Sequence, residues 1–171
     1  RNDGLIKDFA QVLSIKIKTI IMAQSLVKNY LHIIFSTKLR TEFIDKKIEN
    51  ELFSYIATIC KDYDSPAIQI GGTDDHIHIL LNLSRKFAIM KVIQEIKAHS
   101  SKWIKTKGKK YENFFWQDGY GAFSVSQKHI FATINYIQNQ REHHKNQTYK
   151  VEFLTILNKY EMDYDEKYLW D

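Results

Sequence analysis

The segment His76–Leu81, with the sequence His-Ile-His-Ile-Leu-Leu, constrains most strongly how this chain can fold. Alternate side chains of a β-strand point to opposite faces, so His76 and His78 share one face while Ile77 and Ile79 share the other. Amphipathic helices commonly bury such an aliphatic face. The segment therefore predicts a strand with two imidazoles on one face of a sheet and helices packed against the other.

The apolar patterns elsewhere predict an α+β domain around this strand. Alternating or β-rich segments predict strands at residues 29–36, 67–70, 76–83 and 119–125. Apolar residues at helical spacing predict helices at residues 44–61, 89–105, 127–144 and 151–160. This order is typical of one antiparallel sheet with helices packed on one face, as in ferredoxin-like and RRM-like folds.

Length and composition fit one domain. The chain has 171 residues, 44% of them apolar, with 1 Pro and 6 Gly, so little of it can be a long linker. Residues 22–171 are predicted to form this domain, because Met22 reads like a native start. Residues 1–21 are then either an added N-terminal extension or an ordinary extra segment of the chain.

The sequence carries no sign of a membrane span or of an oxidising compartment. No stretch is long and apolar enough to cross a bilayer, and the apolar N-terminal patch has no signal-peptide cleavage site. Cys60 is the only cysteine and lies among apolar residues, so we expect a buried structural thiol. These features predict a cytoplasmic protein.

His76 and His78 are a candidate metal site. Imidazoles at positions i and i+2 of a rigid strand can converge on one cation, and Asp74 or Asp75 directly before them can orient an imidazole. The short His-x-His pattern also arises by chance, and the histidines are then merely solvated or hydrogen-bonded. The two aspartates are in that case simple turn residues.

A second candidate site lies on the predicted helix 127–144. One stripe of that helix consists of His129, Thr133, Tyr136 and Gln140. The Tyr136 phenol can attack a phosphate, and the Gln140 amide oxygen beside it can ligate a hard cation that lowers the pKa of the phenol. An interfacial tyrosine that packs its ring and leaves its hydroxyl in water is the alternative.

Nearby residues offer alternatives for both roles. Tyr149 is the second candidate nucleophile, although no glutamine follows it at four residues. His143 or His144 could replace Gln140 as the third metal ligand. The pattern alone therefore leaves the ligand set open beyond the histidine pair.

The charge of the chain favours a polyanionic partner, with a net charge of +5 and an isoelectric point of about 9.1. Lysines and aromatic residues crowd together in residues 97–116, which suits flexible single strands because lysines meet phosphates and rings stack on bases. The alternative is a solvated lysine face over a core that contains the rings. The predicted DNA-contacting residues are Lys38, Arg40, Lys97, Lys102, Trp103, Lys105 and Lys107.

Taken together, these motifs resemble the single-tyrosine transposases of the HUH endonuclease superfamily, which the smallest bacterial insertion sequences encode and which include the REP-associated tyrosine transposases. The histidine motif corresponds to His76-Ile77-His78, and the tyrosine motif to Tyr136 followed four residues later by Gln140. Further similar blocks are residues 30–38, 100–103, 115–125, 136–144 and 163–169. The resemblance covers the chain from about Met22 to its end.

The resemblance implies an HUH endonuclease fold and a transposase for single-stranded DNA that has a hairpin at the ends of an insertion sequence. It implies that Tyr136 forms a 5′-phosphotyrosine link and that His76, His78 and Gln140 hold Mg²⁺ or Mn²⁺. It also implies a homodimer in which the histidine pair of one chain meets the tyrosine helix of the other. Such a protein would be associated with DNA in a bacterial or archaeal cytoplasm.

Two other functions share parts of this pattern. A related HUH nickase, or a domesticated endonuclease that processes chromosomal repeats, would use the same chemistry. A non-catalytic RRM-like nucleic-acid-binding domain belongs to another class, and residues 119–123 faintly resemble its Gly-rich aromatic signature. Such a binder would not need the histidine pair, Tyr136 and Gln140 together, so metal binding separates the two classes.

Overall fold

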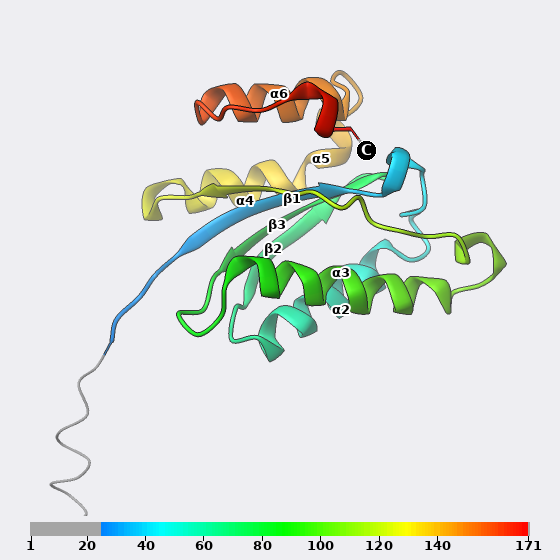
Figure 1. The fold of residues 1–171 in the computed structure, drawn as a ribbon, viewed down its shortest axis with the longest axis horizontal. Helices are drawn as coiled ribbons and strands as arrows, with labels where there is room; N and C mark the ends of the chain where they lie inside the picture. Colours follow the sequence, from blue (N-terminus) through cyan, green and yellow to red (C-terminus); the bar gives the residue numbers. More distant parts are fainter. Residues whose placement is uncertain (1–24, 171) are drawn as a thin grey trace, which may run out of the picture.

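The strand that carries the histidine pair lies inside a four-stranded antiparallel sheet (Figure 1). The strands are β1 (Tyr30–Ser36), β2 (Ala67–Gly72), β3 (His76–Asn82) and β4 (Gly121–Ser124), and their order in the sheet is β2-β3-β1-β4. Pairing of β3 with β1 runs from His76 opposite Ser36 to Asn82 opposite Tyr30. The histidine-bearing strand is therefore held along its full length.

The structure is a computed structural model that describes residues 25–170. The predicted N-terminal extension, residues 1–21, lies outside the described residues. The helices are α2 (Glu49–Asp62), α3 (Ile89–Lys105), α4 (Ile130–Gln138), α5 (Gln140–His143) and α6 (Tyr149–Lys159), and the 3₁₀ turns are η1 (Lys38–Arg40), η2 (Lys109–Tyr111), η3 (Gln127–His129) and η4 (Glu166–Tyr168). Within residues 25–170, no helix is both long enough and apolar enough to cross a membrane.

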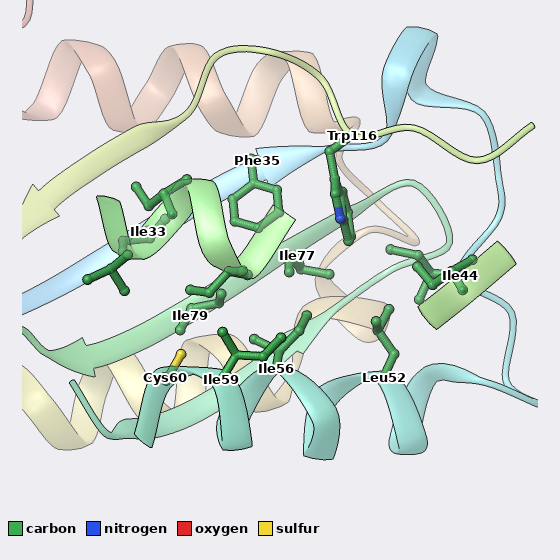
Figure 2. Packing of buried hydrophobic residues seen from close by; sticks show 14 of the residues in the cluster. Ile33, Phe35, Ile44, Leu52, Ile56, Ile59, Cys60, Ile77, Ile79 and Trp116 are labelled. Atoms are coloured by element: carbon green, nitrogen blue, oxygen red, sulfur yellow. The ribbon is translucent and has the colours of Figure 1, made fainter. Parts of the chain in front are cut away.

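Helices α2 and α3 cover the aliphatic face of the sheet, and Figure 2 shows this packing. Ile77 and Ile79 of β3 are fully buried there, beside Ile33 and Phe35 of β1. The helical residues that meet them include Leu52, Ile56, Ile59, Cys60, Val92, Ile93 and Ile96. Burial raises the pKa of Cys60 to about 12, so this thiol is a packed core residue, as expected, and a poor nucleophile.

The predicted α+β class and its antiparallel sheet are confirmed, but helices cover both faces of the sheet where the sequence predicted one (Figure 1). Besides the histidines, the second face carries Ile34, Leu80 and Phe123. Helix α6 packs on Ile34 and Phe123, and α4 packs on Leu80. These apolar side chains require a cover, because leaving them in water is unfavourable.

The predicted helix 127–144 is divided in the structure. Residues 127–129 form η3, α4 ends at Gln138, and α5 begins at Gln140. Asn139 lies between the two helices at φ −97° and ψ 18°. After this turn the Gln140 side chain is buried, with 1% of its surface exposed.

Two glycines of the sheet let α4 and α6 approach it closely. A Cβ at Gly71 of β2 would lie 2.3 Å from the backbone oxygen of Ile137 in α4. A Cβ at Gly121 of β4 would lie 2.7 Å from the ring of Phe153 in α6. Both separations are far below the ordinary contact distance of about 3.5–4 Å, so a larger residue would displace the backbone of α4 at Gly71 and the ring of Phe153 at Gly121.

We expect Gly71→Ala to lower the free energy of unfolding by about 1–3 kcal/mol, the usual cost of overpacking. The backbone of Ile137 cannot move aside as the end of a flexible side chain could. Gly119→Ala is the matched control, because the nearest atom to a Cβ there is Nε2 of Gln117 at 4.0 Å. Urea denaturation measures both variants, and equal stability of the two would contradict the close approach of α4.

Candidate metal and tyrosine site

The turn between β2 and β3 orients the imidazole of His76. Nδ1 of His76 lies 2.7 Å from Oδ1 of Asp75 and 2.8 Å from the hydroxyl of Thr73. Because an ionised carboxylate can only accept, Nδ1 carries a proton in this contact. Asp75 is therefore the orienting partner, whereas Asp74 accepts a hydrogen bond from Arg141 at 3.1 Å.

A third histidine, His32 of β1, orients His78. Nε2 of His32 lies 2.9 Å from Nδ1 of His78, and the two rings stack with centroids 5.1 Å apart. Burial lowers the pKa of His78 to about 4, and burial together with His78 lowers that of His32 to about 3, so both rings are neutral at pH 7. Nε2 of His78 is buried and has no hydrogen-bond partner among residues 25–170. Nothing in the sequence pattern of β1 marks His32 for this role.

Helices α4 and α5 bring the predicted nucleophile and the predicted third ligand to these histidines. The ring of Tyr136 lies 5.8 Å from that of His78, measured between centroids. Oε1 of Gln140 lies 3.4 Å from Nε2 of His76. The four predicted residues of the two motifs therefore meet within a single chain.

A buried carboxylate that the sequence analysis missed, Glu152 of α6, lies at the centre of this cluster. Its side chain is 2% exposed and accepts hydrogen bonds from the Tyr136 hydroxyl, from Nε2 of Gln140 at 2.9 Å and from Nε2 of His144 at 3.0 Å. Burial alone would raise the pKa of Glu152, but His144, the nearby imidazole of His78 and the Tyr136 hydroxyl hold it well below its ordinary value, so the carboxylate is ionised. Burial and the charge of Glu152 in turn raise the pKa of Tyr136 well above its usual range.

The donor atoms of the cluster fit a divalent cation. One ligand atom each of His76, His78 and Glu152 lie within 4.8 Å of one another, and Oε1 of Gln140 faces the same point. Imidazole nitrogens combined with carboxylate and amide oxygens suit cations such as Mn²⁺ and Mg²⁺. The unpartnered Nε2 of His78 is the atom that such an ion would satisfy.

A pocket of about 550 Å³ opens beside the cluster. Its lining includes Asp75 and His144, which contact the site residues, and Tyr149 at the start of α6. Charges of both signs line its wall, positive from Arg40 and Lys145 and negative from Glu42, Asp74 and Asp75. The pocket therefore gives access to the edge of the site.

The predicted DNA-contacting residues divide into two groups. Lys38 and Arg40 are exposed on η1, directly after β1, and Arg40 lines the pocket beside the site. Lys102, Trp103, Lys105 and Lys107 lie at the end of α3 and just beyond it, in the layer that covers the opposite face of the sheet. The structure therefore does not bring the two groups together.

Three of the predicted lysines, Lys97, Lys105 and Lys107, contact aromatic rings or backbone oxygens. The ammonium of Lys105 lies 3.7 Å from the ring centroid of Phe115, and that of Lys107 lies 4.2 Å from Trp103. Lys97, which the sequence placed among the DNA contacts, donates to the backbone oxygens of residues 117, 118 and 119 at 2.6, 3.1 and 2.7 Å. Lys97 thus holds this loop in place, and its contact with DNA stays a prediction.

The remaining candidates of the sequence analysis lie at different distances from the site. His129 is exposed, and the Thr133 hydroxyl donates to the backbone oxygen of His129, so neither belongs to the cluster. His144 contacts Glu152 directly, while Nε2 of His143 lies 3.9 Å from a Glu152 oxygen. Tyr149 is buried with its ring 4.6 Å from that of His76.

Fold and site together define an α+β protein with a candidate histidine–carboxylate metal site beside a half-buried tyrosine. The sequence profile of a family described as "Transposase IS200 like" matches residues 25–140. The chain therefore belongs to the IS200-like transposase family and is a DNA transposase, which confirms the resemblance seen in the sequence. The matched region contains the histidine pair, Tyr136 and Gln140.

Two solved structures share the fold. One is a protein from Deinococcus radiodurans described as a candidate transposase, with 21% identity and a TM-score of 0.54 over 70% of this chain and 96% of that one. The other is a REP-associated tyrosine transposase bound to a REP hairpin, with 15% identity and a TM-score of 0.54 over 72% of this chain and 73% of that one. No curated protein matches the chain significantly.

We expect His32→Phe to weaken Mn²⁺ binding about 10–100-fold, the usual effect of removing a partner that orients a metal-binding histidine. In His32→Gln the amide can still hydrogen-bond Nδ1 of His78, so this variant should lose less Mn²⁺ affinity than His32→Phe. His99→Phe, an exposed substitution on α3, is the control. Isothermal titration calorimetry on the folded proteins gives the affinities, and wild-type affinity in His32→Phe would refute the orienting role.

Proposed function

We propose that this transposase cleaves and rejoins single-stranded DNA at insertion-sequence ends through a 5′-phosphotyrosine intermediate on Tyr136. The observation that carries the proposal is that the phenol and the histidine pair meet at one buried carboxylate. The Tyr136 hydroxyl donates to one oxygen of Glu152, whose other oxygen lies 3.5 Å from Nε2 of His78 and 3.6 Å from Nε2 of His76. A nucleophile so close to a candidate cation site supports phosphoryl transfer.

His76, His78 and Gln140 are the residues that we propose to hold the divalent cation, Mg²⁺ or Mn²⁺. When bound, such a cation polarises the scissile phosphate and lowers the pKa of a neighbouring phenol. Asp75 and His32 keep the two imidazoles turned with Nε2 toward the cation site. The chain thus supplies a preformed site, in which the ligands lose little freedom on binding.

The proposed reaction needs no external energy source. The phenolic oxygen of Tyr136 forms a bond to phosphorus, and the bond between phosphorus and the 3′ oxygen breaks. The proton lost by the phenol is balanced by the proton that the departing 3′ hydroxyl gains. Attack of a 3′ hydroxyl on the phosphotyrosine reverses the step and restores the phenol, so the link conserves the bond energy.

A DNA hairpin is the proposed substrate, because a protein with the same fold binds a REP hairpin. The support is an analogy between folds. We propose Lys38 and Arg40 as the DNA contacts nearest the cleavage site, since Arg40 lines the pocket beside it. Lys102, Trp103, Lys105 and Lys107 would contact a more distant part of the DNA.

The homodimer with shared active sites stays a prediction, as does the division into an extension at residues 1–21 and a single domain at residues 22–171. In one chain, the histidine pair already meets the tyrosine helix. Sharing of sites would therefore require α4 to α6 to leave their own sheet for that of a partner chain. The same side chains would then form the site, with Tyr136 supplied by the other copy.

One feature of the sheet favours this enzyme over a non-catalytic RRM-like binder. RRM domains stack bases on aromatic residues of an uncovered sheet face. Phe123, in the segment that resembles the RRM signature, is 1% exposed beneath α6. A related nickase would use the same residues and the same chemistry as the transposase.

We expect Tyr136→Phe to abolish covalent attachment to DNA, because the substitution removes only the attacking oxygen. The full chain is mixed with labelled circular single-stranded phage DNA and Mn²⁺, and the products are separated on a denaturing gel. Wild type should give a metal-dependent protein–DNA band that is lost in Tyr136→Phe and retained in Tyr30→Phe, the control. A band that persists in Tyr136→Phe would move the nucleophile elsewhere, with Tyr149 as the next candidate.

The double variant Lys38→Glu/Arg40→Glu should bind single-stranded DNA more weakly and with a smaller salt dependence. Loss of two phosphate contacts lowers the slope of log K against log salt by about 1.4, since each contact contributes roughly 0.7 for single strands. Lys46→Glu/Lys47→Glu changes the net charge equally at two other exposed positions and serves as the control. Fluorescence anisotropy at several salt concentrations measures both, and equal losses would show that only net charge matters.

A further inference from the structure

The proposed cation ligands are two imidazoles and an amide, all neutral, yet they surround an ionised carboxylate. Glu152 belongs to α6 and lies beyond residue 140, where the match to the family ends. Its side chain is 2% exposed, although burial of an unpaired carboxylate is strongly unfavourable. The neighbours of its two oxygens therefore indicate what the carboxylate does.

The two oxygens of Glu152 have different partners. Oε1 accepts from the Tyr136 hydroxyl and from Nε2 of Gln140. Oε2 accepts from Nε2 of His144 at 3.0 Å, which leaves its other lone pair for the interior of the cluster. One oxygen thus faces the proposed nucleophile and the other faces the histidine pair.

Oε2 faces the Nε2 atoms of both histidines. Nε2 of His76 lies 3.6 Å away, in a ring whose Nδ1 is held by Asp75. Nε2 of His78 lies 3.5 Å away and is a buried atom without a hydrogen-bond partner among residues 25–170. Oε1 of Gln140 lies 3.4 Å from Nε2 of His76. A divalent cation at the centre of these nitrogen and oxygen atoms would give Nε2 of His78 a partner and offset the charge of the carboxylate.

The separations also fit a single ion. The ligand atoms of His76, His78 and Glu152 all lie within 4.8 Å of one another. Ligands about 2.1 Å from an octahedral ion are roughly 3 Å apart when adjacent. The Glu152 oxygen, at 3.5 and 3.6 Å from the two nitrogens, would therefore need to move by only about half an ångström to reach ligand geometry.

We propose that Glu152 is itself a ligand of the divalent cation through Oε2, while its Oε1 holds the hydroxyl of Tyr136 beside that cation. The proposal rests on the proposed function and deepens it by adding a charged ligand from α6. The carboxylate offsets part of the cation's charge, which two neutral imidazoles and an amide cannot do. It also fixes the distance between nucleophile and cation through one rigid group.

The experiment is a calorimetric titration of the full chain with Mn²⁺. We expect Glu152→Gln to bind Mn²⁺ at least about 10-fold more weakly than wild type. Loss of a residue that only orients a metal ligand already weakens metal binding by about this factor. Glu152→Asp keeps the charge on a shorter side chain, so its affinity for Mn²⁺ should lie between those of wild type and Glu152→Gln. Glu142→Gln is the matched control, because Glu142 is an exposed carboxylate near the site that pairs with Lys145 at 2.7 Å. It should bind Mn²⁺ as wild type does.

The outcomes separate this inference from the proposed function. If wild type binds Mn²⁺, His76→Ala does not, and Glu152→Gln binds as wild type, Glu152 is no ligand and the histidine site stands. If wild type itself does not bind Mn²⁺, the proposed metal site and the role of Glu152 both fail.

A second measurement covers the case in which the variants at residue 152 do not fold, as judged by circular dichroism. Wild-type crystals soaked in Mn²⁺ should show the ion about 2.1–2.2 Å from a Glu152 oxygen. An ion bound to His76 and His78 but more than 3 Å from both oxygens of Glu152 would overturn the proposal.

Discussion

The burial of one ionised carboxylate, Glu152, is the constraint on which the histidine-bearing half of the molecule depends. An isolated charge in the interior is unfavourable by several kcal/mol or more, so every neighbour must either donate to it or share a cation with it. Tyr136, Gln140 and His144 donate from α4, from α5 and from the residue after α5. The carboxylate on α6 therefore ties together segments that otherwise contact the sheet separately, and their positions are fixed by charge as well as by packing.

The sheet contributes to this arrangement through two glycines, which have no side chains to keep the helices away. Gly71 and Gly121 present bare backbone at the points where α4 and α6 press against β2 and β4. The helices can therefore come close enough for side chains of ordinary length to reach the histidines on β3. On the opposite face, aliphatic packing of α2 and α3 supports β1 and β3, which pair in register along their whole length, so the imidazoles lie on a rigid base.

Much of the fold and part of the site could be read from the sequence, because both depend on local periodicity. Strand alternation gave the shared face of His76 and His78, and helical spacing gave α3 at its observed bounds. The turn at Asn139 could not be read, since nothing in the apolar pattern of residues 127–144 marks it.

Glu152 could have been suspected, because it falls on the buried stripe of α6 with Tyr149, Phe153 and Leu157. Its partners come from other segments, and only tertiary contacts reveal them. The lysines at the end of α3 were grouped with Arg40 by composition, but α3 covers the opposite face of the sheet.

The same carboxylate links the protonation of the proposed nucleophile to the proposed cation. Burial and the charge of Glu152 raise the pKa of Tyr136 well above its usual range, so the phenol of the protein alone stays protonated. A cation held beside Glu152 would offset that charge and attract the phenolate, which would reverse the electrostatic part of the shift. Because the hydroxyl and the histidine pair lie against opposite oxygens of one side chain, the proposed mechanism would make the reactivity of Tyr136 depend on occupancy of the cation site. A nucleophile of this kind would not cut DNA before the cation and the substrate are both in place.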